Sequence, residues 1–127
     1  MADLRSPLAR VRGLGSAKEG THHWWAQRLT ALALVPLTIW LVVSVIALSG
    51  ADHAEASAWI SALWPAALMV LTIAMTFHHG QLGLQVVIED YVKNEYVKIA
   101  AILLVKGAAL VLSVVAIAAV ARIAIGG

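Results

Sequence analysis

The chain has 127 residues, of which 61% are hydrophobic and 13% are charged, whereas an ordinary soluble domain carries about 25% charged residues. This balance indicates a membrane protein and leaves no length for a separate soluble catalytic domain. The chain contains no cysteine, which excludes disulfides, iron–sulfur clusters and thiolate metal sites built from this chain. Its net charge of +2 comes mostly from basic residues before the first apolar run, so it indicates membrane orientation rather than binding to nucleic acid.

A polar N-terminal segment, residues 1–24, precedes the first apolar run. Its basic residues are Arg5, Arg10, Arg12 and Lys18. A run of about 20 uncharged residues follows, long enough to cross a bilayer as a helix. Trp24, Trp25 and Arg28 stand at its start, where aromatic and cationic residues commonly meet the membrane interface. The sequence therefore predicts a first transmembrane helix over about residues 25–49.

Two further apolar runs follow, separated by polar connections. The connection 49–57 contains neither Lys nor Arg and leads to a second predicted transmembrane helix over about residues 61–89. The connection 89–98, EDYVKNEYVK, leads to a third over about residues 97–125. The sequence thus predicts an all-α membrane protein, a single anchor domain of residues 1–127 with three transmembrane helices.

Basic residues are distributed unevenly among the polar segments. They precede the first predicted span and occur in the connection that contains Asp90, but the other connection has none. The positive-inside rule therefore places the N-terminus and the Asp90 connection in the cytoplasm and the C-terminus on the opposite side. Within the third span, Lys106 is expected to snorkel or to pair with another group, and Arg122 to anchor the far interface.

The segment FHHGQLGLQVVIEDY, residues 77–91, places two adjacent histidines inside an apolar run. On a helix, His79 shares one stripe with Gly83, Val86 and Asp90, because eleven residues are close to three full turns. His78 lies on a different stripe. At 1.5 Å per residue, His79 is about 16 Å from Asp90, near the middle of the bilayer if Asp90 marks the surface.

Two interpretations of His79 are open from the residues alone. One is a neutral imidazole that hydrogen-bonds to a neighbouring helix. The other is an axial ligand of a haem, since Gly83 one turn away leaves space for a flat macrocycle and an apolar pocket between helices suits a porphyrin. A haem would need its second ligand from elsewhere.

Two stretches resemble a known family. HHGQLGLQVVIEDYV is similar to the second-span signature of the small hydrophobic membrane anchor subunits of succinate dehydrogenase, respiratory complex II. In that signature a histidine precedes an Asp-Tyr pair by eleven residues, with a glycine between them. HHWWAQRLTALALVP is similar to the start of the family's first span, including an arginine at the position of Arg28.

This resemblance implies specific roles for five residues. His79 matches an axial ligand of a haem b that lies between this anchor and a companion cytochrome b-type anchor, with Gly83 packing beside the haem. Arg28 matches an arginine near the haem propionates. Tyr91 matches a tyrosine that hydrogen-bonds ubiquinone, and Asp90 matches its supporting neighbour.

The resemblance also implies partners and a location. The chain would pack in a helical bundle with the companion anchor and hold the iron–sulfur and flavoprotein subunits at a bacterial inner membrane, with its C-terminus periplasmic. It would contribute to electron transport from succinate to quinone in the respiratory chain, with no catalytic activity by itself and no nucleic acid as partner.

Several alternatives stay open. The doubled histidine allows His78 to be the ligand in place of His79. The roles of His22 and His23 are undecided between interface residues and contacts to a haem propionate or to soluble subunits, and that of Lys106 between snorkelling and pairing with another helix. A quinol:fumarate reductase anchor would run the reverse reaction. A cofactor-free transporter or structural membrane protein belongs to another class; the absence of Asp and Glu from the apolar parts of the three spans, which in the second is about residues 62–88, argues against a proton-coupled carrier.

Overall fold

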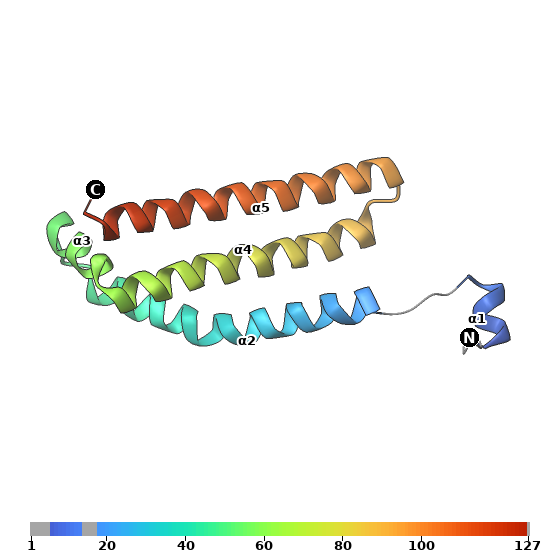
Figure 1. The fold of residues 1–127 in the computed structure, drawn as a ribbon, viewed down its shortest axis with the longest axis horizontal. Helices are drawn as coiled ribbons and strands as arrows, with labels where there is room; N and C mark the ends of the chain where they lie inside the picture. Colours follow the sequence, from blue (N-terminus) through green and yellow to red (C-terminus); the bar gives the residue numbers. More distant parts are fainter. Residues whose placement is uncertain (1–5, 14–17, 127) are drawn as a thin grey trace.

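The computed structural model describes residues 6–13 and 18–126, and within these ranges all regular structure is helical. The helices in chain order are α1 (Pro7–Val11), α2 (Lys18–Ala47), α3 (His53–Ser61), α4 (Leu63–Tyr91) and α5 (Glu95–Ala124) (Figure 1). The predicted all-α fold with three long apolar helices is confirmed. Of the N-terminal basic residues, Arg5 lies outside the described residues.

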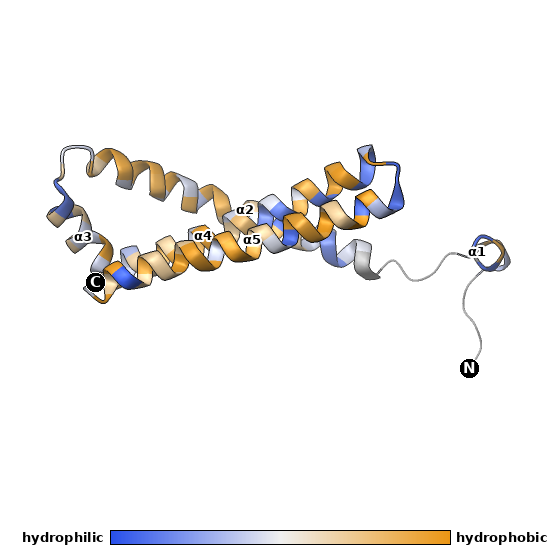
Figure 2. Cartoon of the chain, turned by 90° about the horizontal axis from the view of Figure 1, so that it is seen from above, coloured by the Kyte–Doolittle hydropathy of each residue, from blue (hydrophilic) through white to orange (hydrophobic). Residues whose placement is uncertain are grey.

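Three of these helices are long and apolar enough to cross a membrane. The segments Gly20–Ala47, Leu63–Tyr91 and Glu95–Ala124 have 28, 29 and 30 residues. At 1.5 Å per residue they are about 42–45 Å long, against a hydrocarbon core of about 30 Å, so they extend past its surfaces or tilt. Figure 2 shows hydrophobic residues along most of their length and hydrophilic residues at the turn between α4 and α5.

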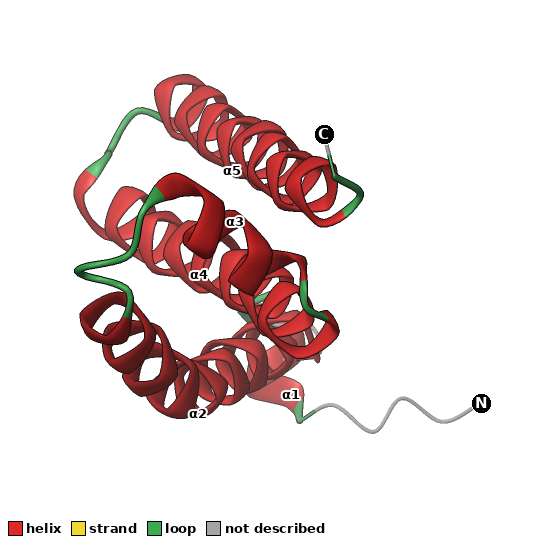
Figure 3. Ribbon diagram, turned by 90° about the vertical axis from the view of Figure 1, so that its left-hand side faces the viewer, coloured by secondary structure: helices red, strands yellow, loops and turns green. Residues whose placement is uncertain are grey.

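α4 lies between α2 and α5. It packs against both neighbours, whereas α2 and α5 make no direct packing contact in the described part of the chain (Figure 3). Few large side chains are buried by this packing: within the described ranges, Leu37, Leu82 and Val120 are the buried hydrophobic residues. Most apolar side chains face outward, as expected for helices covered by lipid or by another subunit.

A short helix, α3, closes one end of the bundle and packs against α4 and α5. The Ser61 hydroxyl donates to the Ile123 carbonyl near the end of α5, at 3.1 Å. The indole rings of Trp59 and Trp40 stack with centroids 5.9 Å apart, which connects α3 to α2. All three long helices are therefore joined to α3 at this end.

The sequence analysis treated residues 49–57 only as a polar connection, and α3 was missed. The Asp52 carboxylate accepts from the Glu55 backbone N–H at 2.8 Å, and the Glu55 carboxylate accepts from the Asp52 N–H at 3.3 Å. This reciprocal capping box satisfies two N–H groups at the start of α3. The helix ends at Ala62, whose extended backbone separates it from α4.

The opposite end of the bundle is a tight turn between α4 and α5. α4 ends at Tyr91, and its cap residue Val92 donates from its backbone N–H to the Ile88 carbonyl at 2.9 Å. The Asn94 side-chain oxygen accepts from the N–H groups of Tyr96 and Val97 and begins α5. Asp90 and Tyr91 are the last two residues of α4 and lie directly before this turn.

Candidate functional site

His79 faces α2 and hydrogen-bonds to it. Its Nδ1 lies 3.0 Å from the hydroxyl oxygen of Thr30, which is 49 positions earlier in the chain. Thr30 is only 5% exposed, and His79 is half-buried. Within the described residues this is the one hydrogen bond of the imidazole, so Nε2 has no partner from the chain itself. The bond to a neighbouring helix therefore leaves the second ring nitrogen available, and the two sequence interpretations of His79 are compatible.

The Thr30 hydroxyl is also bonded to its own helix. It donates to the Ala26 carbonyl at 2.7 Å and lies 3.1 Å from the Gln27 carbonyl. A buried threonine hydroxyl commonly bonds back to the preceding turn of its helix in this way. The sequence analysis did not single out Thr30, because one threonine in an apolar helix carries no local signal of what it contacts on another helix.

Gly83 lies one turn beyond His79 and also faces α2. A Cβ atom added at Gly83 would lie 3.7 Å from the Gln27 side-chain nitrogen, an ordinary van der Waals distance. Gln27 thus occupies the space beside the glycine within this chain. The packing of Gly83 against a haem stays a prediction.

α2 carries a polar stripe that the sequence analysis missed, formed by His23, Gln27 and Thr30 at i, i+4 and i+7. This spacing places the three side chains on one face of a helix and was a readable signal. The Nε2 atom of His23 and the Oε1 atom of Gln27 are buried without a hydrogen-bond partner in the described part of the chain. His23 is half-buried, whereas His22 is exposed. The interpretation as a residue of the interfacial aromatic belt therefore suits His22 better than His23.

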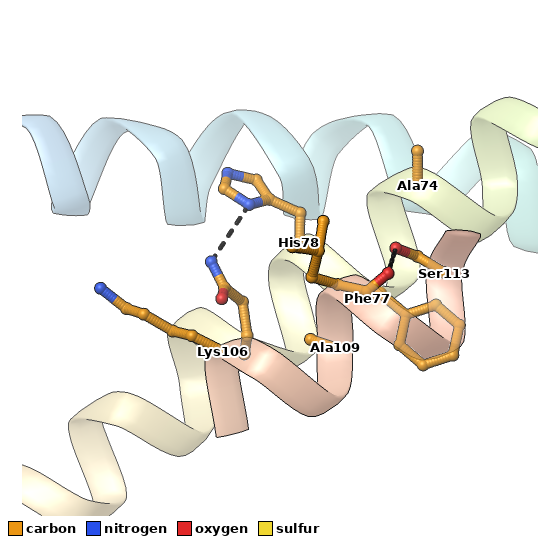
Figure 4. A pocket seen from close by; sticks show the side chains of 8 residues that line it. Ala74, Phe77, His78, Lys106, Ala109 and Ser113 are labelled. Carbon is orange, nitrogen blue, oxygen red and sulfur yellow. Dashed lines mark hydrogen bonds between the residues drawn. The ribbon is translucent and has the colours of Figure 1, made fainter. Parts of the chain in front are cut away.

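His78 faces a different neighbour. It lines a pocket between α4 and α5 whose wall also includes Lys106 (Figure 4). Its Nδ1 lies 3.4 Å from the Gln81 side-chain nitrogen. Lys106 forms no ion pair with any described residue. The two adjacent histidines are thus divided between the two sides of α4, in agreement with their different stripes.

Arg28 lies near the start of α2 and is exposed. Its guanidinium carbon is 5.3 Å from the centroid of the Trp24 ring, and Trp24 in turn meets Trp25 edge to face at 5.0 Å. Being two residues from Thr30, Arg28 points to nearly the opposite side of the helix, since each residue turns it by about 100°. The chain alone does not bring Arg28 and His79 together, and the propionate contact of Arg28 stays a prediction.

Asp90 and Tyr91 are exposed at the end of α4, with Tyr91 at 80%. Neither side chain makes a hydrogen bond within the described residues. A second phenol, Tyr96, stands at the start of α5 and is 87% exposed. The groups of the candidate quinone contact are therefore open to a partner or ligand. Asp90 lies about 16 Å from His79 along α4, at 1.5 Å per residue.

No group of three or more His, Cys, Asp or Glu residues that could hold a metal ion occurs among the described residues. The candidate site of this chain consists of one histidine hydrogen-bonded to Thr30 on α2 and, three turns away, an exposed Asp-Tyr pair.

Comparisons with known proteins agree with these features. Residues 2–120 match the family described as succinate dehydrogenase/fumarate reductase transmembrane subunit. The succinate dehydrogenase hydrophobic membrane anchor subunit of Rickettsia bellii is 37% identical over 106 residues, covering 82% of this chain and 83% of the relative. The subunit of the same name from Paracoccus denitrificans is 33% identical over 86 residues, covering 68% and 67%.

A third relative, the succinate dehydrogenase hydrophobic membrane anchor subunit of Rickettsia conorii, is 28% identical over 105 residues, covering 82% of this chain and 83% of its own length. No solved structure matches the chain. The family match extends over nearly the whole chain and includes α2, α4 and most of α5. The chain therefore belongs to the succinate dehydrogenase/fumarate reductase transmembrane subunit family.

Proposed function

We propose that this chain is a membrane anchor of a succinate:quinone oxidoreductase in which His79 supplies one axial ligand of haem b. The observation that carries the proposal is the environment of His79. Its Nδ1 is bound to Thr30 on α2, and its Nε2 has no partner among the described residues. A histidine that binds a metal uses one ring nitrogen for the metal, while a hydrogen bond from the other nitrogen to the protein holds the ring in place.

The residues around His79 fit a haem shared with another chain. His79 lies well inside a long apolar helix and is half-buried. The other protein ligand of the haem iron would come from the companion cytochrome b-type anchor. When bound, haem b carries single electrons. Gly83 and Arg28 are the residues that we assign to packing beside the haem and to its propionates, respectively.

The quinone contact is assigned to Tyr91 with Asp90 beside it. A quinone that accepts electrons gains negative charge on its oxygens, and a positioned phenol O–H stabilises that charge and can donate a proton. The exposure of Tyr91 supports this role, because its hydroxyl is not engaged within the described chain. The remaining walls of a ubiquinone site then come from the companion anchor and the iron–sulfur subunit.

The outward apolar faces of the long helices support assembly with lipid and with a companion anchor. In this assembly the iron–sulfur and flavoprotein subunits bind on the cytoplasmic side of a bacterial inner membrane. The N-terminus and the α4–α5 turn face the same side, and the C-terminus is periplasmic. The family description covers both succinate dehydrogenases and fumarate reductases, and the three relatives named above are succinate dehydrogenase subunits. We therefore favour oxidation of succinate over the reverse reaction.

The test compares two adjacent substitutions in the purified complex. His79→Ala is expected to abolish the optical spectrum of the b-type haem, because it removes an axial nitrogen. His78→Ala is the matched control, since it lies next in the chain but faces α5; it should leave the spectrum in place. An assembled complex that keeps its haem in His79→Ala, or that loses it only in His78→Ala, would contradict the assignment.

A further inference from the structure

A hydrogen bond between Thr30 and His79 joins α2 to α4. We propose that Thr30 is a positioning residue that selects the tautomer of His79 with the proton on Nδ1 and so presents the Nε2 lone pair to iron. This inference rests on the proposed function of His79 as a haem ligand. It adds a residue from α2 to a site otherwise placed on α4.

The Thr30 hydroxyl carries a single proton. The Ala26 and Gln27 carbonyl oxygens, at 2.7 and 3.1 Å, can only accept hydrogen bonds, so the hydroxyl proton is directed to them. The hydroxyl then has only lone pairs left for His79. The Nδ1 atom, at 3.0 Å, must therefore be the donor.

A neutral imidazole carries one proton. With that proton on Nδ1, Nε2 holds the lone pair that a metal requires. The opposite tautomer would require Thr30 to turn its proton from the Ala26 carbonyl toward His79, which gives up the shorter of the bonds. Because Thr30 is 5% exposed, water has little access to replace either partner.

The hydrogen bond also affects the electronic character of the ligand. An Nδ1–H that donates to an oxygen makes the other nitrogen more basic and favours the higher oxidation state of a bound metal. Loss of the Thr30 hydroxyl is therefore expected to raise the midpoint potential of the haem. Outer-shell partners of metal ligands typically change affinity or activity by about 10–100-fold. A tenfold weakening of the oxidised form relative to the reduced form corresponds to a rise of about 59 mV for a one-electron couple.

The chain provides a matched control in Thr72 on α4. Thr72 is also 5% exposed, and its hydroxyl donates to the Leu68 carbonyl at 2.7 Å, as that of Thr30 does to Ala26. Within the described residues, Thr72 makes no bond to a histidine. Thr72→Val therefore removes an equally buried hydroxyl that also donates to its own helix but has no hydrogen bond to His79.

The experiment is a redox titration of the haem in the purified complex, followed optically. Thr30→Val should raise the haem midpoint potential by about 59 mV, the equivalent of a tenfold change. Thr30→Ser restores the hydroxyl and should return the potential close to that of the unaltered complex. Thr72→Val should leave it unchanged. If Thr30→Val does not assemble, Thr30→Ala removes the same hydroxyl without adding a methyl group, and the same rise is expected.

The outcomes distinguish failure of the role proposed for Thr30 from failure of the haem-ligand role proposed for His79. An unchanged potential in the hydroxyl-free variant, or an equal shift in Thr72→Val, overturns the role of Thr30 while His79 stays the ligand. Failure of Thr30→Ser to restore the potential also overturns it, because the hydroxyl would not be the group that matters. Retention of haem in His79→Ala instead overturns the proposed function itself.

Discussion

At the scale of single residues, His79 and His78 show how far a sequence pattern can identify a functional group. The helical stripe predicted that the two histidines differ, and the structure places one toward α2 and the other toward α5. The polar stripe of α2 marked the face on which Thr30 lies, but its contact with His79 could not be predicted, because it joins residues 49 positions apart and depends on how two helices cross. The local pattern thus identified the candidate ligand but not the residue that fixes its ring.

Tyr91 is the residue that we expect to separate quinone reduction from succinate oxidation. Tyr91→Phe removes a phenolic donor and should lower quinone reductase turnover by about 10²–10⁴-fold, the range for loss of a positioned acid–base group. Succinate oxidation with an artificial acceptor should be unchanged. Quinone reductase turnover and succinate oxidation with the artificial acceptor are measured in the same preparation and compared.

Tyr96→Phe is the matched control for this prediction. Tyr96 is the other tyrosine at this end of the bundle and is as exposed as Tyr91. Equal turnover of Tyr91→Phe and the unaltered complex, or an equal decrease in Tyr96→Phe, would remove Tyr91 from the quinone contact.

At the scale of elements, α2 and α4 approach each other beside Gly83. A Cβ at this position would meet the Gln27 side-chain nitrogen at 3.7 Å, so a methyl group fits, and a larger side chain has to displace Gln27. The sequence analysis assigned this space to a haem. In the structure part of it is filled by Gln27, which a helical stripe on a single segment cannot reveal.

Substitutions at Gly83 should therefore separate by size. Gly83→Ala should change the stability of the assembled complex by no more than about 1 kcal/mol, the usual scale for this change within a helix. Gly83→Leu should lower it by roughly 1–3 kcal/mol, because overpacking displaces α2 from α4. The thermal midpoint of the detergent-solubilised complex, with its haem spectrum, measures both effects.

Gly80 supplies the comparison, since nothing lies within 4 Å of a Cβ added there. If Gly83→Leu and Gly80→Leu have the same midpoint, close packing of α2 on Gly83 is not what the larger side chain disturbs. A changed haem spectrum in Gly83→Ala would place the haem against this glycine.

α3 shows a second limit of sequence reasoning at this scale. Its polar composition and its position between two apolar runs favoured a loop, and isolated helices of this length are marginal in water. The capping box of Asp52 and Glu55 was the available signal. Contacts with α4 and α5 then provide the stabilisation that the short helix lacks by itself.

At the scale of the whole molecule, composition was sufficient to predict the architecture. Three apolar runs of spanning length can satisfy their backbone groups in a bilayer only as helices or closed barrels, and their length favours helices. The arrangement of a companion anchor could not be predicted, because the outward faces of all three helices are similarly apolar. We expect Arg28, which contacts Trp24 within this chain, and the Nε2 side of His79 to gain further partners in the assembled complex.

The orientation of the whole molecule can be tested because the chain has no cysteine. Single cysteines at exposed positions in α3 (Ala54→Cys) and in the α4–α5 turn (Lys93→Cys) mark opposite ends of the bundle. In spheroplasts, a membrane-impermeant maleimide should label Ala54→Cys at once and Lys93→Cys only after permeabilisation, because the positive-inside rule predicts a cytoplasmic α4–α5 turn.

Denatured samples of both variants control for reactivity and should label fully. The reverse pattern in intact spheroplasts would invert the orientation and place Tyr91 on the periplasmic side. It would leave the haem assignment of His79 unaffected, because that residue is near the middle of its helix.

α4 continues without interruption from His79 to Tyr91. An unbroken helix fixes both the distance and the angle between any two of its side chains, at about 1.5 Å and 100° per residue. The proposed electron-carrying and proton-donating ends of the segment thus form one rigid body. The spacing between them is encoded by the number of residues more than by their identity, so we expect the intervening positions to accept exchange of one apolar side chain for another far more readily than gain or loss of a single residue.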